Sequence, residues 1–402
     1  MSCSASRLER SGCRWAVVDL AIGTRSERAR DALATRDNGG MPADSAPEPA
    51  RPVRWRREAG EIGRSLARFG PSPGPRWHLG LQAAVAMTVP VGTLSLLGHE
   101  SIALLAATGA FATLYGGRLA PRERAVFVPL VAAALWLCAA AGVALALLGP
   151  VAVSLGLVVV ATVVSLLMFG RSVGPPGPLF PVLIFGLSAH VIAPRAGHPS
   201  IDPLLYLGVL AGSFAFAWLV TLAPLAREAV RRRPVAAPRR LRDLFPAGHR
   251  DATTRTLVAR AAAIAVVGTI AALVVDPERA YWIVGAGIAV LGVSAGRRVA
   301  LSRGIHRALG TAAGAAVYLA LAFVPLPGVA LALVLGVLQF VIELVVVRHY
   351  ALALVFITPL VLLILSAAGA GGPELAVERV VDTAVGAVLG ILSGLIVLRP
   401  RR

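Results

Sequence analysis

The chain carries the same series of hydrophobic segments twice. Six apolar segments are followed, about 175 residues later, by six more in the same order. Gln82–Gly117 aligns with Arg260–Gly296, and Leu204–Leu222 aligns with Val380–Leu398. A duplicated block of membrane-spanning helices is a common architecture for a secondary transporter, with the binding site between the repeats. It is uncommon for an enzyme, so we expect no catalytic activity.

Composition places these segments in a membrane. Apolar residues make up 57% of the chain and charged residues only 15%, whereas a soluble domain carries more charge. The apolar runs are about 16 to 25 residues long, near the length that crosses about 30 Å of hydrocarbon. They lack the strict alternation of an outer-membrane barrel. The sequence therefore predicts an all-α, polytopic membrane protein with about twelve transmembrane helices in two parallel six-helix repeats.

Proline and glycine mark the ends of the predicted helices. The predicted helices cover about 79–97, 101–116, 125–148, 151–169, 178–193, 203–224, 257–275, 280–295, 306–324, 327–347, 350–369 and 378–398. The predicted domains are an Arg-rich tail at 1–78, a first membrane repeat at 79–224, a basic linker at 225–256, a second membrane repeat at 257–398 and a basic tail at 399–402.

The distribution of arginine predicts the orientation. The net charge is +18, and all 39 basic residues are arginine. The predicted loops leave only Arg195, Arg279 and Arg379 on the side opposite the two termini. Because loops rich in arginine stay in the cytoplasm, we predict a multi-pass protein of the inner or plasma membrane with both termini cytoplasmic. Six crossings per half make the repeats parallel, related by an axis along the membrane normal.

The remaining composition limits the partners. Basic blocks in the tails and linker have no stacking aromatic residues among them, so we expect contact with membrane lipids and not with nucleic acid. The three cysteines form no CxxC pair and no zinc spacing, and no phosphate-binding loop is present. We therefore predict no cofactor, no metal and no ATP-driven step. The sequence leaves a homo-oligomer open.

Small residues and prolines predict special helix contacts. Glycines four residues apart recur in the sixth and twelfth helices, around Gly212 and Gly390. Such spacing leaves a flat face, so we predict that these two helices pack at a pseudo-symmetric contact. The fifth and eleventh helices carry Pro181 and Pro359. An interior proline frees a backbone carbonyl, which predicts interrupted helices beside a transport site, although a tolerated kink explains the same residues.

Polar residues near helix ends form the candidate site. A carboxylate ligand needs a cation or a helix N-terminus for its charge and an apolar wall for its ring or chain. Intramembrane carboxylates are candidates for proton coupling. The predicted substrate-binding residues are Arg307, Thr311, Arg348, His349 and Thr358, and the predicted proton-coupling residues are Asp382 and Glu343.

Structural roles explain several of the same residues. Glu343 and Arg348 form a candidate ion pair near the cytoplasmic surface, where long side chains reach water. Asp382 is also a favourable carboxylate at a positive helix end. Tyr281 and Trp282 open the eighth helix and have the character of an interfacial aromatic anchor.

Four motifs in the second half resemble a known family. They are YWIVGAGIAVL, RALGTAAGAAV, RHYALALVFITPLVLL and ERVVDTAVGAVLG, which begin at Tyr281, Arg307, Arg348 and Glu378. Together they resemble the fusaric acid resistance-like family, which groups with bacterial aromatic acid exporters and is distantly similar to plant malate channels. The first half resembles it more weakly, through LLAATGAFATLYGG from Leu104.

The resemblance implies an inner-membrane efflux transporter for small organic or aromatic acid anions, and we expect that efflux to be proton-coupled. Two alternatives stay open at this point. A passive organic-anion channel needs no proton-linked carboxylate, and a membrane scaffold transports nothing. A current stimulated by substrate favours the channel, and a requirement for a pH gradient favours the transporter.

Overall fold

The computed structural model describes residues 52–71, 74–194, 199, 201–228, 241–245, 251–292, 294–367 and 372–398. The chain divides into two units, Met1–Arg57 and Glu58–Arg402, and the contacts below all lie within the second unit. Most of the predicted tail at 1–78, much of the predicted linker at 225–256 and all of the predicted tail at 399–402 lie outside the described residues.

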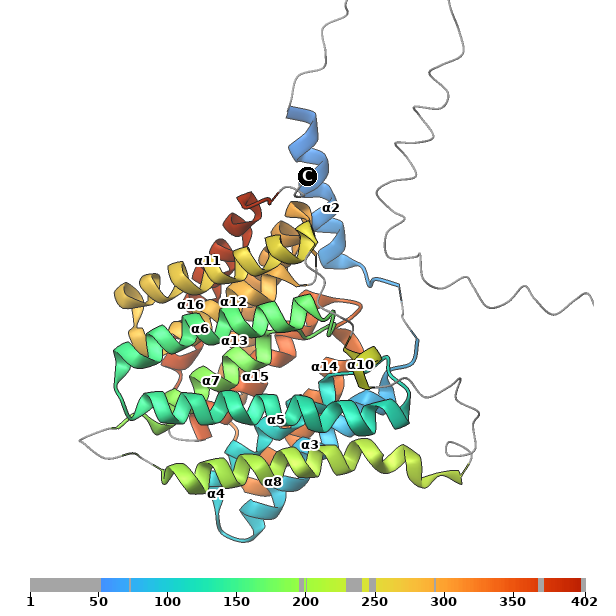
Figure 1. Cartoon of the computed structure of the whole chain (residues 1–402), viewed down its shortest axis with the longest axis vertical. Helices are drawn as coiled ribbons and strands as arrows, with labels where there is room; N and C mark the ends of the chain where they lie inside the picture. The colour runs from blue at the N-terminus through green and yellow to red at the C-terminus, as the bar shows by residue number, and fades with distance from the viewer. Residues whose placement is uncertain are drawn as a thin grey trace, which may run out of the picture. The chain divides into compact units, whose positions relative to one another are not determined.

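All regular structure in the described residues is helical (Figure 1). The predicted all-α fold is therefore confirmed, and each predicted helix has a counterpart. The first half contains α3 (Trp77–Leu96), α4 (Glu100–Ala103), η1 (Leu104–Leu114), α5 (Pro121–Ala146), α6 (Pro150–Gly170), α7 (Leu179–Ile192) and α8 (Pro203–Leu222). The second half contains α11 (Ala252–Val275), α12 (Ala280–Leu291), α13 (Arg297–Leu321), α14 (Gly328–Val345), α15 (Tyr350–Ala367) and α16 (Glu374–Leu392). Shorter or flanking elements are α2 (Pro52–Ala67), η2 (Ala223–Ala226), α10 (Leu241–Leu244), η3 (Pro277–Arg279) and η4 (Ser393–Leu395).

Local chemistry sets several helix starts. Proline occupies the first position of α5, α6 and α8, where its fixed φ suits a helix and its missing N–H costs no hydrogen bond. Asp202 accepts a hydrogen bond from the Leu205 N–H at the start of α8. Asp251 accepts one from the Thr254 N–H at the start of α11. These carboxylates satisfy N–H groups that the helices leave without partners.

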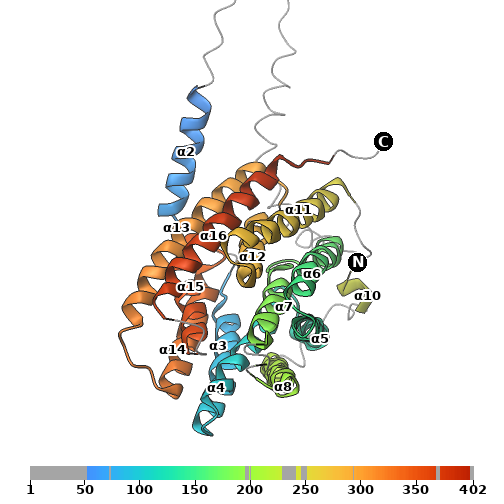
Figure 2. The same cartoon turned by 90° about the vertical axis from the view of Figure 1, so that its left-hand side faces the viewer.

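The contacts between helices repeat from one half to the other. In the first half, α5 packs on α7 and α8, and η1 packs on α3 and α8. In the second half, α13 packs on α15 and α16, and α12 packs on α11 and α16. These are the same pairs when the helices of each half are numbered in order. Figure 2 shows α5 to α8 grouped on one side and α13 to α16 on the other, with α3 and α11 between them. This arrangement is what a duplicated sequence predicts.

The two most extensive contacts between the halves are equivalent. Helix α3 of the first half packs along α14 of the second, and α6 of the first half packs along α11 of the second. Because α3 and α11 are the first helices of their halves, and α6 and α14 are the fourth, the two contacts are equivalent. Each half therefore places its first helix against the fourth helix of the other.

Several helices are long and apolar enough to cross a membrane. Within the described residues six qualify, namely α3, α5, α6, α8 with η2, α11 and α14. Apolar side chains such as Leu155, Val159 and Val337 are exposed on α6 and α14, as expected for surfaces that face lipid. Helices η1, α7 and α15 are apolar but shorter. That all twelve predicted segments span a membrane stays a prediction.

The predicted contact between the sixth and twelfth helices is wrong. Gly212 on α8 is exposed, and a Cβ added there would meet nothing within 4 Å. Gly390 on α16 is buried, but it faces α12, where a Cβ would lie 2.7 Å from Val290 Cβ. Glycine spacing identified a flat face in both helices, but only α16 uses that face for a helix contact.

The predicted interruption of the fifth helix is also wrong. Pro181 is the third residue of α7, in the first turn, where no intrahelical N–H is needed. The carbonyl of Gly177 accepts a hydrogen bond from the Tyr115 hydroxyl at 2.7 Å, so it is occupied. Pro359 does lie inside α15. Of the two predicted proline interruptions, only the one at Pro359 lies inside its helix.

Several helices start earlier than predicted, and the difference is largest for α13. Helix α13 begins at Arg297, so Arg297, Arg298 and Arg303 lie on the helix and not in a preceding loop. Arginine is a good helix former, which explains the extension. The added turns bring the Arg303 guanidinium back to the Ala289 carbonyl of α12, to which Nη2 donates at 2.8 Å.

Candidate functional site

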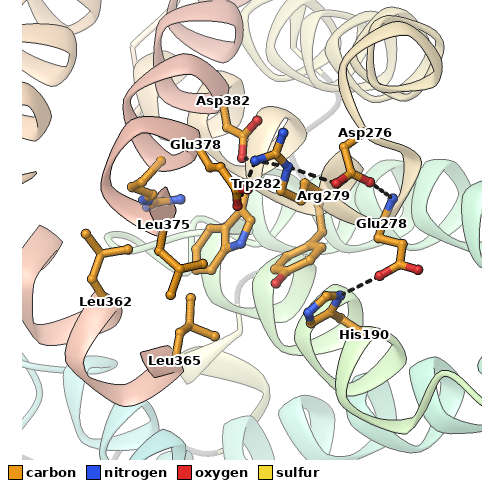
Figure 3. Close-up of a pocket in the computed structure, with 12 residues that line it drawn as sticks. His190, Asp276, Glu278, Arg279, Trp282, Leu362, Leu365, Leu375, Glu378 and Asp382 are labelled. Atoms are coloured by element: carbon orange, nitrogen blue, oxygen red, sulfur yellow. Dashed lines mark hydrogen bonds and ion pairs between the residues drawn. The ribbon is translucent and has the colours of Figure 1, made fainter. Parts of the chain in front are cut away.

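A cavity of about 220 Å³ lies where the ends of α7, α15 and α16 meet η3 and the start of α12 (Figure 3). Its charged and titratable lining is His190, Asp276, Glu278, Arg279, Glu378, Arg379 and Asp382. Its apolar and aromatic lining is Tyr281, Trp282, Leu362, Leu365 and Leu375. The cavity therefore combines a dense set of charges with an apolar wall, which is typical of a site for a small amphipathic ligand.

Arg279 lies between three carboxylates (Figure 3). Its Nη1 is 2.8 Å from Glu378 Oε2, and its Nε is 3.3 Å from Asp276 Oδ2. The same Nε is 3.8 Å from Asp382 Oδ2. Glu378 and Asp382 lie on adjacent turns of α16, and Asp276 precedes η3. The guanidinium of Arg279 therefore ties the loop between α11 and α12 to the start of α16.

A weaker pair ties the first half to the same loop. His190 Nδ1 near the end of α7 lies 3.6 Å from Glu278 Oε2 (Figure 3). Residues of both halves thus meet at this end of the molecule, which is where the binding site of a duplicated transporter is expected.

Two buried charges on α16 lack hydrogen-bond partners among the described residues. Arg379 is 5% exposed, and its Nε and Nη1 atoms make no hydrogen bond. Its Cζ lies 3.9 Å from the centroid of the Trp282 ring, a cation–π contact. Asp382 is 1% exposed, and its Oδ1 makes no hydrogen bond. Other buried polar atoms in the described residues, such as Arg260 Nη1 and Thr269 Oγ1, also lack hydrogen bonds. Arg379 and Asp382 differ from these two because each both carries charge and lines the cavity, a combination that points to a functional role.

The ionised carboxylates outnumber the guanidiniums in this cavity. Its lining has four carboxylates and two guanidiniums, which leaves two negative charges when His190 is neutral. Arg279 is shared among three of the carboxylates, whereas Arg379 forms no ion pair within 4.0 Å in the described residues.

A second polar group lies near the other ends of α13 and α15. The buried Arg307 donates from Nη1 to the Tyr350 hydroxyl at 2.9 Å. The Arg303 guanidinium lies 4.4 Å from the centroid of the same tyrosine ring. Thr311, one turn further along α13, is buried, and so is Thr358, which packs on Gly314 of α13. Three of the predicted substrate-binding residues are therefore buried within the contact between α13 and α15.

The other two predicted substrate-binding residues contact the chain that precedes α3. His349 accepts a hydrogen bond at Nδ1 from the Leu352 N–H, and its Nε2 lies 3.0 Å from the Leu66 carbonyl. Arg348 is exposed, and its backbone carbonyl accepts a hydrogen bond from the Gly70 N–H at 2.7 Å. These contacts cap α15 and hold the segment after α2, and they do not place either residue in the cavity.

Glu343 belongs to a third group, away from the cavity. It is buried on α14 and pairs with Arg76 Nη2 at 2.9 Å, so the predicted pair with Arg348 is wrong. Arg124 lies in the same region, where it donates to Gln82 Oε1 at 2.6 Å and to the Thr113 carbonyl at 2.7 Å. Of the two predicted proton-coupling residues, only Asp382 lines the cavity.

Sequence reasoning missed most of the cavity. Arg279 and Arg379 were counted only as rare basic residues on the sparsely charged side. The available signal was that both α12 and α16 are preceded or opened by a Glu-Arg pair, at Glu278 and Glu378. Trp282 is not an interfacial anchor, because it is 8% exposed and lies beneath the Arg379 guanidinium.

Comparison with known proteins finds a family model that matches the second half. Residues 253–393 match the model of a family described as fusaric acid resistance protein-like. A protein of Bacillus subtilis (strain 168), described as the uncharacterized membrane protein YvaC, is 36% identical over 124 residues. That match covers 30% of this chain and 19% of the relative, so the chain spans about a fifth of that protein's length. No solved structure matches the chain.

The matched region coincides with the structural second half. It runs from the first turn of α11 to the end of α16, and every residue that lines the cavity lies inside it except His190. The motifs that resembled the family in the sequence form the walls of the cavity and the contact between α13 and α15. The chain is thus a helical membrane protein whose residues 253–393 match the model of the fusaric acid resistance protein-like family.

Proposed function

We propose that the protein is a transporter that exports small organic acid anions, aromatic acids among them, with export coupled to protons, and that it is not an enzyme. The observation that carries this proposal is the pair of buried charges without hydrogen-bond partners, Arg379 and Asp382, in a cavity at the end of a bundle of apolar helices. Charges buried inside membrane proteins mark substrate and proton pathways.

The orientation follows from the arginine distribution. Both termini lie in the cytoplasm of a cell whose inner or plasma membrane holds the protein, surrounded by lipid. The cavity then opens toward the outer side, because Arg279 and Arg379 belong to the sparsely charged side. Arg307 and Tyr350 lie toward the cytoplasmic side.

Buried polar groups connect the two sides. Arg379 interacts electrostatically with Arg307 and Tyr350 as well as with Asp382. A carboxylate substrate entering from the cytoplasm meets Arg307 first and then Arg379, while Thr311 and Thr358 supply hydroxyls between apolar side chains. When the contact between α13 and α15 that buries these groups opens, they would replace the hydration of a carboxylate by fixed donors.

Asp382 is the proton-binding group of the proposal. Charged or titratable groups face it from three elements, the loop at η3, the start of α12 and α16 itself. They are Asp276, Arg279, Tyr281, Glu378 and Arg379. Burial of Asp382 favours its neutral form, and the guanidiniums of Arg279 and Arg379 favour its ionised form. The protonation of Asp382 therefore changes when its contacts with Arg279 or Arg379 change.

Transport into proteoliposomes tests the proposal. Purified protein is reconstituted, and accumulation of a panel of aromatic and aliphatic carboxylates is measured with and without an imposed pH gradient. Asp382→Asn should abolish accumulation driven by the gradient, whereas Glu374→Gln, at an exposed carboxylate in the first turn of α16, should leave it intact. A substrate current that ignores the gradient indicates a passive channel, and no flux of any compound indicates a scaffold.

A further inference from the structure

The cavity contains two buried charges of opposite sign, each with polar atoms that form no hydrogen bond within the described residues. Arg379 and Asp382 lie three residues apart on α16, so their side chains leave neighbouring positions of one helix face. Both are more than nine-tenths buried, and both have polar atoms without hydrogen bonds within the described residues. A ligand that carries only a carboxylate satisfies the Arg379 guanidinium and leaves the Asp382 Oδ1 without a donor.

The charge of the cavity also disfavours a simple anion. Four carboxylates and two guanidiniums line it, and the Arg279 guanidinium is already within 4.0 Å of Asp276, Glu378 and Asp382. Asp276, Glu278 and Glu378 are partly exposed to water, which screens their charge. Asp382 is buried, so placing a further uncompensated negative charge beside it is unfavourable. A ligand that brings an ammonium group together with its carboxylate adds no net charge.

Exchange for protons gives a separate reason. An exchanger needs its substrate and the proton to exclude each other at the binding site. A simple anion binds better beside a protonated Asp382, which is the opposite linkage. An ammonium group binds only the ionised carboxylate, so a proton on Asp382 displaces it. In both cases, a simple anion and a ligand with an ammonium group, the protein groups that face Asp382 are Asp276, Arg279, Tyr281, Glu378 and Arg379.

The wall opposite these charges is aliphatic. Leu362 and Leu365 come from α15, and Leu375 comes from the start of α16 (Figure 3). With the Trp282 ring they form an apolar surface within a cavity of about 220 Å³. This surface suits a branched aliphatic or small aromatic side chain.

We propose that the cavity binds a zwitterion, an α-amino acid with an apolar side chain, with its carboxylate on Arg379, its ammonium on Asp382 and its side chain against the three leucines. This inference rests on the proposed function. It narrows the proposed substrates from organic acids in general to organic acids that also carry an amine.

Three probes with the same branched aliphatic group test the inference. They are leucine, 4-methylpentanoate, which lacks the amine, and 3-methylbutylamine, which lacks the carboxylate. Binding to the purified full-length protein is measured by calorimetry, and each probe is also assayed for uptake into proteoliposomes. Leucine should bind about tenfold or more tighter than either analogue, because each analogue loses one charge-assisted contact.

Two variants assign the contacts. Asp382→Asn should remove the preference for leucine over 4-methylpentanoate, and Arg379→Gln should weaken both carboxylate probes together. Glu374→Gln, on the same helix but exposed, serves as the matched control and should bind leucine as the native protein does. Each variant is first checked for a monodisperse, thermally stable preparation, and the three native-protein affinities test the inference even where a variant does not fold.

The outcomes separate the two proposals. If 4-methylpentanoate binds as tightly as leucine and is transported, the inference is overturned while the proposed function holds. If leucine binds with the stated preference but no probe crosses the membrane, the site assignment holds and the transport proposal fails. If none of the three probes binds, the inference is rejected whatever the carboxylate panel does.

Discussion

The guanidinium of Arg379 lies 3.9 Å from the centroid of the Trp282 ring, where a buried cation meets a buried aromatic face. The two residues belong to different helices, α16 and α12, which pack along each other. The indole face supplies part of the stabilisation that water would otherwise give to the cation. It does so without using the N–H donors at the edge of the guanidinium, so Nε and Nη1 remain available to an acceptor.

Replacement of Trp282 should therefore separate two contributions of its ring to carboxylate binding, the cation–π contact with Arg379 and the filling of space. Trp282→Leu removes the cation–π contact, and we expect carboxylate binding to weaken about tenfold, in line with about 1–2 kcal/mol for a desolvated contact. Trp282→Phe keeps an aromatic face and should lose less. Calorimetric titration of both variants measures this, and equal losses in the two would show that the ring face is unimportant.

The Arg279 ion pairs can be measured by a double-mutant cycle. Arg279→Gln leaves the carboxylates of Glu378 and Asp382 without their shared cation, so we expect a clear fall in thermal stability in detergent. Adding Asp382→Asn to that variant should restore part of it, with a coupling energy of about 1–3 kcal/mol. Strict additivity of the two substitutions would contradict the contact.

Two glycines give a matched test of the packing. An alanine Cβ at Gly390 would lie 2.7 Å from Val290 Cβ and 2.9 Å from the Gly287 carbonyl oxygen. Gly390→Ala should therefore destabilise the protein by about 1–3 kcal/mol. Gly212→Ala meets open space and should be neutral, or stabilising by up to about 1 kcal/mol through helix propensity. Thermal denaturation compares the two, and the reverse order would reject the packing of α16 on α12.

Cysteine labelling tests the orientation. In a background without the three native cysteines, single cysteines replace Arg118, Pro199 and Arg233. A reagent that cannot cross the membrane should reach only the cysteine at position 199 in intact cells, because arginine-rich loops stay inside. Labelling of the cysteine at position 233 before the cells are opened would invert the predicted topology.

The helices could be predicted from sequence because apolar runs and their Pro or Gly boundaries are local signals. Helix α15, predicted over 350–369, runs from Tyr350 to Ala367. The cavity could not be predicted in the same way. Its residues come from segments as distant as His190 and Asp382, and only packing brings them together. Asp382 was identified because a carboxylate inside an apolar segment is conspicuous, whereas Arg279 lies in a turn where charge is unremarkable.

Glu343 illustrates a different kind of error. Its predicted partner, Arg348, is close in sequence and on the same side of the membrane, but a helix end and a turn separate the two. The actual partner, Arg76, precedes α3, and it reaches Glu343 because α3 lies along α14. The duplication predicted equivalent contacts within each half. It gave no direct signal for contacts between the halves, such as that of α3 with α14.

That exchange has a consequence for how such a chain arises. With α3 on α14 and α6 on α11, one side of the first and fourth helices of each half is covered only by the other half. A six-helix ancestor would cover the same surfaces by forming a dimer with a second copy of itself about a twofold axis. In that dimer the first helix of each copy would pack on the fourth helix of the other. Fusing two such genes converts a dimer that depends on concentration into a single chain with a fixed partner. The two copies are then free to diverge, so that the second supplies every residue of the charged cavity except His190.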